Sequence, residues 1–214
     1  MEYMADTMTS KPNSIFTVGH STHSYEHFLL LLRETGITAV ADVRTSPYSR
    51  HFPQFNKDNL KEELRVDGIA YSFLGKELGG RPGGRQYYCD GVADYERMAE
   101  APAFKHGLQR VLEGAKKYRI ALMCSEHDPL DCHRCLLVGR ALAGRGIAVK
   151  HIKSDGAIAN HHEIEQRLLT SEGKMGDDLF LSPEEKLADA YRTRARKVAY
   201  NENTSGSYSH AVAE

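Results

Sequence analysis

The apolar residues of this 214-residue chain fall into short continuous runs separated by stretches of helical spacing. The runs do not alternate with polar residues, as they would in a strand with one face in water. Continuous runs are typical of parallel strands that helices cover on both faces. Five strands are predicted from them, at residues 15–18, 39–43, 69–73, 120–124 and 148–152.

Apolar residues three and four positions apart predict helices between these strands. Ser24 can cap the first helix, Gly36 ends it, and Gly68 ends the second. The predicted helices cover residues 24–36, 56–67, 95–113, 135–143, 161–169 and 183–198. Together these elements predict an α/β fold of three layers, with a mostly parallel five-stranded sheet between helices, as in Rossmann-like and flavodoxin-like domains.

The same pattern divides the chain into parts. Residues 1–13 lack periodicity and are predicted to be a flexible arm, and residues 14–169 are predicted to form the α/β domain. Residues 170–214 are more polar and are predicted to be an extension, partly helical and then disordered. The glycine-rich residues 75–95 are predicted to be a long loop, and loops of that length are usually functional or disordered. We expect residues 75–85 to cover the functional site.

Composition excludes several classes of protein. With 41% hydrophobic and 27% charged residues the chain can bury a core. It contains no run of 18 apolar residues, so no membrane span is predicted. The net charge of −1 excludes a uniformly basic nucleic-acid binder, although a local basic groove stays possible. The start of the chain does not resemble a secretory signal, so its four cysteines indicate cytoplasmic thiols rather than disulfides.

The densest candidate chemistry follows the fourth predicted strand. Cys124 ends that strand, Glu126 follows it, and Cys132-His133-Arg134 opens the next helix with Asp131 as a candidate N-cap. A helix N-terminus and an adjacent arginine both stabilise a thiolate. We therefore expect Cys124 or Cys132 to be a nucleophile, with Glu126 and His133 moving protons. The alternative is that both cysteines simply pack in the core.

Cys132 and Cys135 also form a C-x-x-C pair. This spacing at a helix start after a strand occurs in thioredoxin-like redox sites. A zinc site could instead use Cys124, Cys132, Cys135 and a histidine. The sequence has no second C-x-x-C, which makes both interpretations weaker than a thiolate site.

Polar residues also follow the first two predicted strands. Arg44 follows the second strand and Arg50 lies in the loop after it, where both can bind a phosphate or a carboxylate. Alternatively, Arg44 pairs with Asp42 as a structural bridge. His20 and Ser21 follow the first strand, and His20 can act as acid, base or ligand.

Four motifs carry a resemblance to a known family. They are Val18-Gly-His-Ser21, Asp42-Val-Arg-x-x-Pro-x-Ser-Arg50, Tyr71-x-x-Leu-Gly-Lys-Glu-Leu-Gly-Gly80 and Cys124-x-Glu-x-x-Pro-x-x-Cys-His-Arg134. In this order, over residues 15–169, the chain resembles the DUF488 family. The resemblance implies a three-layer α/β domain with a site at the last motif, and it implies no reaction because the family is named for unknown function.

Three hypotheses follow for the function. The first is an enzyme acting on a small anionic or nucleotide-like ligand, with catalytic residues Cys124, Glu126, Cys132, His133 and His20 and with ligand-binding residues Arg44, Arg50, Arg134, Ser21, Lys76 and Arg81. The second is an iron- or zinc-dependent enzyme with ligands His20, Glu126, Cys132 and His133. The third is a nucleotide or nucleic-acid binding module that uses Arg44, Arg50, Lys76, Arg81 and Arg85 with Tyr48, Tyr87 and Tyr88. For the first, we expect His20, Arg44, Glu126 and Arg134 to line one cavity.

Overall fold

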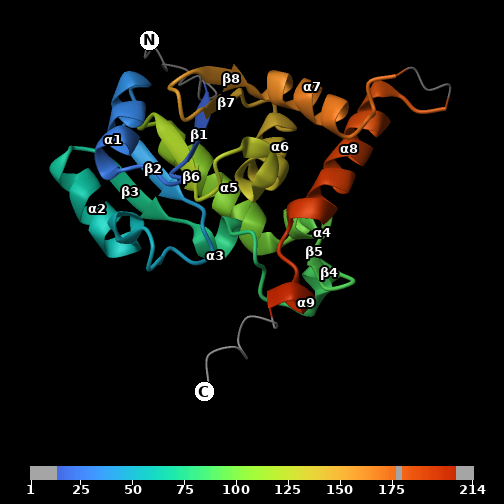
Figure 1. Cartoon of the computed structure of the whole chain (residues 1–214), viewed down its shortest axis with the longest axis horizontal. Coiled ribbons are helices and arrows are strands. Elements are labelled where there is room, and N and C mark those ends of the chain that lie inside the picture. Colours follow the sequence, from blue (N-terminus) through green and yellow to red (C-terminus); the bar gives the residue numbers. More distant parts are fainter. Residues whose placement is uncertain (1–13, 177–179, 206–214) are drawn as a thin grey trace, which may run out of the picture.

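A six-stranded sheet forms the centre of the molecule in the computed structural model, which describes residues 14–176 and 180–205 (Figure 1). Its strand order is β3-β2-β6-β1-β7-β8. The strands are β1 (Ile15–Gly19), β2 (Ala39–Asp42), β3 (Ala70–Phe73), β6 (Ile120–Cys124), β7 (Val149–Ile152) and β8 (Ile158–Asn160). The five strands predicted from the apolar runs are all present and run parallel.

The predicted count of five strands is one too low. β8 pairs antiparallel with β7 at the edge of the sheet. It has only three residues, and Ile158 and Asn160 are exposed. Because an edge strand this short buries little, it leaves no apolar run in the sequence.

Helices cover both faces of the sheet, which confirms the predicted three-layer α/β fold (Figure 1). Phe28 of α1 and Leu60 of α2 pack on one face against Phe16 and Val40. The other face is covered by α5, the helical segment after β6, α7 and α8. The helices around the sheet are α1 (Tyr25–Glu34), α2 (Lys57–Val66), α4 (Tyr95–Glu100), α5 (Pro102–Ala115), α6 (Arg140–Ala143), α7 (His161–Ser171) and α8 (Pro183–Val198).

Two of the predicted boundaries are wrong. The helix predicted at 95–113 is two helices, because Pro102 starts α5 and a proline in a helix interior would remove a backbone hydrogen bond. The loop predicted at 75–95 contains a short helix, a turn of 3-10 helix and a hairpin. These are α3 (Gly75–Leu78), the turn at Arg85–Tyr87, β4 (Tyr88–Cys89) and β5 (Val92–Ala93).

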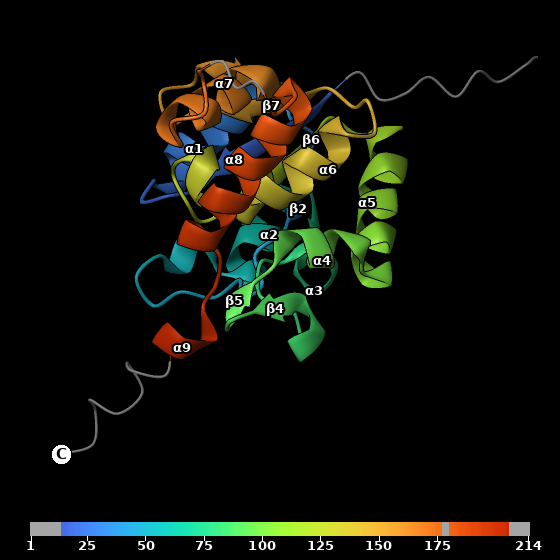
Figure 2. The same cartoon turned by 90° about the vertical axis from the view of Figure 1, so that its right-hand side faces the viewer.

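The segment after α8 runs alongside the β4–β5 hairpin, and Figure 2 shows α9 (Glu202–Ser205) next to these strands. Ala93 N donates to Tyr200 O at 2.9 Å, and Glu202 N donates to Gly91 O at 2.9 Å. Disorder predicted for this end of the chain is wrong for residues 200–205, while residues 206–214 and the predicted arm at 1–13 lie outside the described residues. No helix among the described residues is long and apolar enough to cross a membrane.

A buried chain of hydrogen bonds joins α8 to the sheet. Tyr191 donates to Glu165, which can only accept, so the direction of every other bond is fixed. Tyr191 therefore accepts from His161 Nε2 at 3.0 Å, His161 Nδ1 accepts from His151 Nε2 at 2.9 Å, and His151 Nδ1 accepts from Thr17 at 2.8 Å. Each imidazole is neutral and has both nitrogens satisfied.

The two buried neutral histidines in this chain of hydrogen bonds predict a loss of stability in mild acid. Burial lowers the pKa of His151 well below its ordinary value and also lowers the pKa of His161. Because protonation of these rings favours the unfolded chain, the stability they provide is complete above about pH 6.5 and falls as the pH falls below that value, by about 1.4 kcal/mol per pH unit for each histidine. Urea unfolding at pH 7, 6 and 5 measures this slope.

His151→Gln removes one of these titrations and is expected to make the slope shallower by about 1.4 kcal/mol per pH unit. His106→Gln, at an exposed position on α5, is the control and leaves the slope unchanged. An identical dependence of stability on pH in the wild-type and His151→Gln proteins would contradict a buried neutral His151 and the hydrogen-bond directions that require it.

Candidate functional site

The carboxyl ends of β1, β2 and β6 meet at one edge of the sheet. Backbone pairing continues past the strands, since His20 N donates to Cys124 O and Ser21 N donates to Ser125 O, each at 2.9 Å. Val43 N donates to Met123 O at 3.0 Å. The three loops that the sequence identified therefore start side by side, as parallel strands require.

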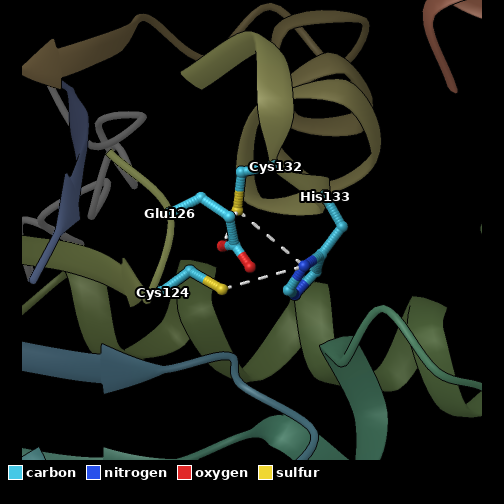
Figure 3. Close-up of side chains that lie close together, drawn as sticks. All are labelled: Cys124, Glu126, Cys132 and His133. Atoms are coloured by element: carbon cyan, nitrogen blue, oxygen red, sulfur yellow. Dashed lines mark hydrogen bonds between the residues drawn. The ribbon is translucent and has the colours of Figure 1, made fainter. Parts of the chain in front are cut away.

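Four side chains from the Cys124–His133 segment point toward one another in Figure 3. The ligand-type atoms of Cys124, Glu126, Cys132 and His133 all lie within 4.8 Å of one another. His133 Nδ1 is 3.8 Å from Cys124 Sγ and 3.9 Å from Cys132 Sγ. Cys132 Sγ is also 2.8 Å from Glu126 Oε2. The sequence hypothesis had named all four of these residues.

The imidazole of His133 is held in one orientation. Its Nε2 lies 2.9 Å from Val43 O, and because a carbonyl only accepts, Nε2 carries the proton. In the neutral ring, Nδ1 then presents a lone pair to both sulfur atoms. The role of the Val43 carbonyl could not be predicted, since a backbone acceptor is not visible in residue types.

The four groups differ in their access to solvent. Cys124 is 2% exposed, Cys132 is 1% exposed and His133 is also buried. The Glu126 side chain is 41% exposed and faces a cavity of about 170 Å³. The cavity is lined by Arg44, Thr45, Ser46, Gly80, Arg81, Tyr95, Cys124, Ser125, Glu126, Asp131, His133, Val198 and Tyr200.

The two thiols differ in acidity. Burial raises the pKa of Cys124 well above its ordinary value, and the nearby Cys132 and Glu126 charges raise it further. Burial also opposes ionisation of Cys132, but a hydrogen bond from Cys124 and the charges of Arg134 and His133 outweigh it and hold the pKa of Cys132 well below its ordinary value. Cys132 is therefore the thiol that ionises first.

The acid–base groups respond to this thiolate. Burial and the charge of Cys132 raise the pKa of Glu126, so Glu126 and Cys132 share one proton over a short contact. Burial alone would lower the pKa of His133, but Cys132 and Glu126 outweigh it and raise that pKa. The cluster thus gathers negative charge around one imidazole.

Arg134 binds the backbone of the loop that carries the cluster. It is 0% exposed and donates to Glu126 O at 2.7 Å and to His127 O at 3.0 Å. Its Nε has no hydrogen-bond acceptor within the described part of the chain. Arg134 N donates to Cys132 Sγ at 3.4 Å, so the sulfur accepts from the first backbone N–H of the helix. Arg134 does not line the cavity.

Asp131 was predicted to cap the helix that follows β6, and this prediction is wrong. Cys132 and His133 separate it from the helix, which begins as π-helix at Arg134–Gly139 and continues as α6. Asp131 instead forms an ion pair with Arg194 of α8. Asp128 caps the preceding turn of 3-10 helix, at Pro129–Asp131, by accepting from Leu130 N at 2.8 Å.

Arg44 is held in a buried ion pair. Its Nε and Nη2 bind the two carboxylate oxygens of Asp42 at 2.9 and 2.7 Å, and Nη2 also donates to Phe55 O. Tyr71 donates to the same carboxylate at 2.7 Å. Since Nη1 also contacts His20, at most one of the five guanidinium N–H groups is left for a ligand.

His20 lies in a neighbouring chamber of about 370 Å³ that shares Arg44, Ser46 and Ser125 with the first cavity. Its Nδ1 donates to Ser21 O at 3.0 Å, so its Nε2 accepts from Arg44. Burial, and then the charge of Arg44, lower the pKa of His20 to about 4. His20 is therefore neutral at physiological pH. Ser21 lines the same chamber.

Some of the remaining residues predicted for the site line the cavity, and others lie elsewhere. Arg81 lines the first cavity, whereas Arg50 and Lys76 are exposed and line neither chamber. The ligand atom of Cys135 groups with those of His151 and His161, within 4.8 Å of one another, and not with the Cys124 cluster. The structure therefore does not bring together the C-x-x-C pair of Cys132 and Cys135.

The role of Gly80 is not visible in the sequence pattern. A Cβ at this position would lie 2.9 Å from Cγ and Nδ1 of His133. Only glycine lets the segment after α3 pass over the imidazole at this distance. Tyr95, Val198 and Tyr200, from α4 and from the end of the chain, complete the cavity and had also carried no signal.

The cluster has the properties of a metal centre. Two thiols, one imidazole and one carboxylate are the donors that zinc and iron take in proteins. In a tetrahedral site with bonds of about 2.3 Å to sulfur and about 2.1 Å to nitrogen, a sulfur and a nitrogen ligand are about 3.6 Å apart. The observed distances from His133 Nδ1 to the two sulfurs, 3.8 and 3.9 Å, are close to this value. The bond from Nε2 to Val43 O is the usual support of a histidine ligand.

The buried arginines predict a large effect on stability. Arg44→Ala strands the carboxylate of Asp42, which is 0% exposed, and is expected to destabilise the fold by about 3–5 kcal/mol. For a chain of this length that loss lowers Tm by about 6–20 °C. The exposed Arg50→Ala is the control and is expected to leave Tm within about 2 °C. A wild-type Tm in Arg44→Ala would mean that Arg44 serves a ligand rather than Asp42.

Comparisons with known proteins agree with the motifs. The family model described as "Domain of unknown function DUF488" matches residues 24–141, more than half of the chain. No curated protein and no solved structure matches. The matched region runs from the residue that caps α1 to α6 and contains Cys124, Glu126, Cys132 and His133. The chain belongs to the DUF488 family.

Proposed function

We propose that this protein is a metal-dependent enzyme in which Cys124, Cys132 and His133 hold a zinc or iron ion that activates water against a small anionic or nucleotide-like substrate. The observation that carries the proposal is the position of His133 Nδ1, which lies 3.8 Å from one sulfur and 3.9 Å from the other while its Nε2 is fixed by Val43 O. Such a ring is oriented for a ligand before any ion binds.

The burial of the groups gives each one a role. Cys124, His133 and Glu126 line the cavity, and Cys132 is buried without lining it. An ion held by these three donors would keep a fourth position for water or substrate, as in catalytic zinc sites, and the Glu126 carboxylate lines the cavity beside them. Two thiolates and a divalent ion cancel in charge, and Arg134 balances the added charge of Glu126.

Glu126 is the group that moves the proton. Its carboxylate is close enough to the thiol of Cys132 to share a proton with it, and with Cys132 bound to an ion as the thiolate, Glu126 would be available to take a proton from water. Zinc enzymes with two thiolates, an imidazole and a nearby glutamate use the ion to activate water and the glutamate as general acid and base. When bound, such an ion lowers the pKa of its water to about 7.

The second candidate is a thiolate enzyme without a metal. It is favoured by the position of Cys132 at the start of a helix beside Arg134, which stabilises a thiolate. However, Cys132 is 1% exposed and does not line the cavity, so a substrate in the cavity has no direct path to its sulfur. Cys124 does line the cavity, but its pKa is raised. The metal hypothesis accounts for both thiols together.

The metal hypothesis predicts about one equivalent of zinc or iron in protein purified without added metal, measured by elemental analysis. Cys124→Ser, Cys132→Ser and His133→Asn are each expected to lose most of that metal, because each removes a donor from a site of three. Cys135→Ser and Cys89→Ser are the matched controls and retain it, since neither thiol belongs to the cluster.

Glu126→Gln separates binding from chemistry, because it is expected to retain the metal and to lose activity. Metal-free wild-type protein that also takes up no Co²⁺ or Zn²⁺ would refute the metal centre. Rapid labelling of Cys132 by iodoacetamide in that protein would then favour the thiolate enzyme.

A glycine pair in one segment tests the geometry around His133. Gly80→Ala places a methyl group 2.9 Å from the imidazole and is expected to weaken Co²⁺ binding at least tenfold. The absorption of thiolate-bound Co²⁺ measures this binding. Gly83→Ala meets no atom within 4 Å in the described structure and is the control. Equal Co²⁺ affinities in the two variants would show that His133 is not a ligand.

A further inference from the structure

The C-terminal segment of the chain forms one wall of the candidate cavity. Val198, the last residue of α8, and Tyr200 both line it. The segment is fixed there by main-chain bonds to the β4–β5 hairpin, since Ala93 N donates to Tyr200 O and Val92 forms a bridge with Asn201. Figures 1 and 2 show that this part of the chain reaches the hairpin only after α8 has crossed the molecule.

The end of α8 is fixed to the loop that carries the cluster. Arg194 forms an ion pair with Asp131 and donates from Nε to Leu130 O at 3.0 Å. These two residues directly precede Cys132. The C-terminal segment therefore contacts the cluster loop on one side of the cavity and the hairpin on the other.

Arg81 is the residue that meets this segment across the cavity. Its guanidinium lies over the ring of Tyr200, with Cζ 4.7 Å from the ring centroid. Its backbone N donates to Thr45 Oγ1 at 3.1 Å. Stacking occupies the face of a guanidinium and keeps its N–H groups in the plane, where they bind carboxylates and phosphates.

The charges around the cavity give Arg81 a distinct position. Arg44 is neutralised by Asp42, and Asp131 is neutralised by Arg194. The guanidinium of Arg81 lies on an aromatic ring instead. The preceding residue, Gly80, packs on the imidazole of His133, so the cation lies in the same wall as the cluster.

We infer that Arg81, positioned by Tyr200, binds a carboxylate or phosphate group of the substrate, so that the C-terminal segment determines which substrates the enzyme accepts. This inference rests on the proposed function, since it takes the cavity beside the cluster as the substrate site. Arg81 is the binding residue, and Tyr200 is a positioning residue that acts through it. Both Val198 and Tyr200 lie outside the region that the family model matches, at residues 24–141.

Titration calorimetry of the full chain with inorganic phosphate, and separately with acetate, tests the inference. In Co²⁺-loaded protein, Arg81→Ala is expected to weaken binding of the preferred anion at least tenfold, and Tyr200→Ala about tenfold. Tyr200→Phe keeps the aromatic ring and is expected to retain the wild-type affinity. A role that depended on the tyrosine hydroxyl would instead be lost in this variant. Arg85→Ala, at an exposed position in the same segment, is the control.

The Co²⁺ absorption spectrum, recorded in each variant, separates this inference from the proposed function. An unchanged spectrum with weakened anion binding in Tyr200→Ala supports the inference. Equal anion affinity in the wild-type, Arg81→Ala and Tyr200→Ala proteins, or no binding of either anion by the wild type, overturns it while the metal centre stands. If the wild type binds no metal, the proposed function fails, and the same titrations of the metal-free protein still decide whether Arg81 and Tyr200 bind an anion.

Discussion

The burial of one arginine is the constraint on which the site depends. Arg134 is completely removed from solvent, and its guanidinium binds the carbonyls of Glu126 and His127. These bonds fold the loop after β6 back onto the start of the next helix. Gly19 makes this possible, because a Cβ there would lie 2.0 Å from the carbonyl oxygen of Glu126. A charged group this deep costs several kcal/mol unless hydrogen bonds and opposite charge compensate it.

That compensation connects the fold to the chemistry. Cys132 and Glu126, which share one proton, supply the opposite charge, and Arg134 in turn lowers the pKa of Cys132. On the other side of the cavity the pair of Asp42 and Arg44 is buried in the same way. The two arginines are thus held by internal partners, and Arg81, which lines the cavity, is the cation that we propose to face the substrate.

Much of this site could be predicted from the sequence, for a physical reason. Parallel strands bring their carboxyl ends to one edge, so polar residues that follow apolar runs, such as Cys124 and His20, must meet there. The use of each group could not be predicted, because it depends on partners far away in the chain. Asp131 has the residue type and position of a helix cap, yet Arg194 binds it from 63 residues away. Likewise, Tyr200 shapes the cavity from a segment that the sequence pattern presented as disordered.

In the proposed site, two sulfurs and one imidazole nitrogen hold one metal ion at the edge of the sheet. X-ray absorption spectroscopy of the metal in the purified protein measures these bonds. We expect a first shell with two sulfur atoms at about 2.3 Å and one or two nitrogen or oxygen atoms at about 2.0–2.1 Å. A first shell made only of nitrogen and oxygen atoms would contradict it.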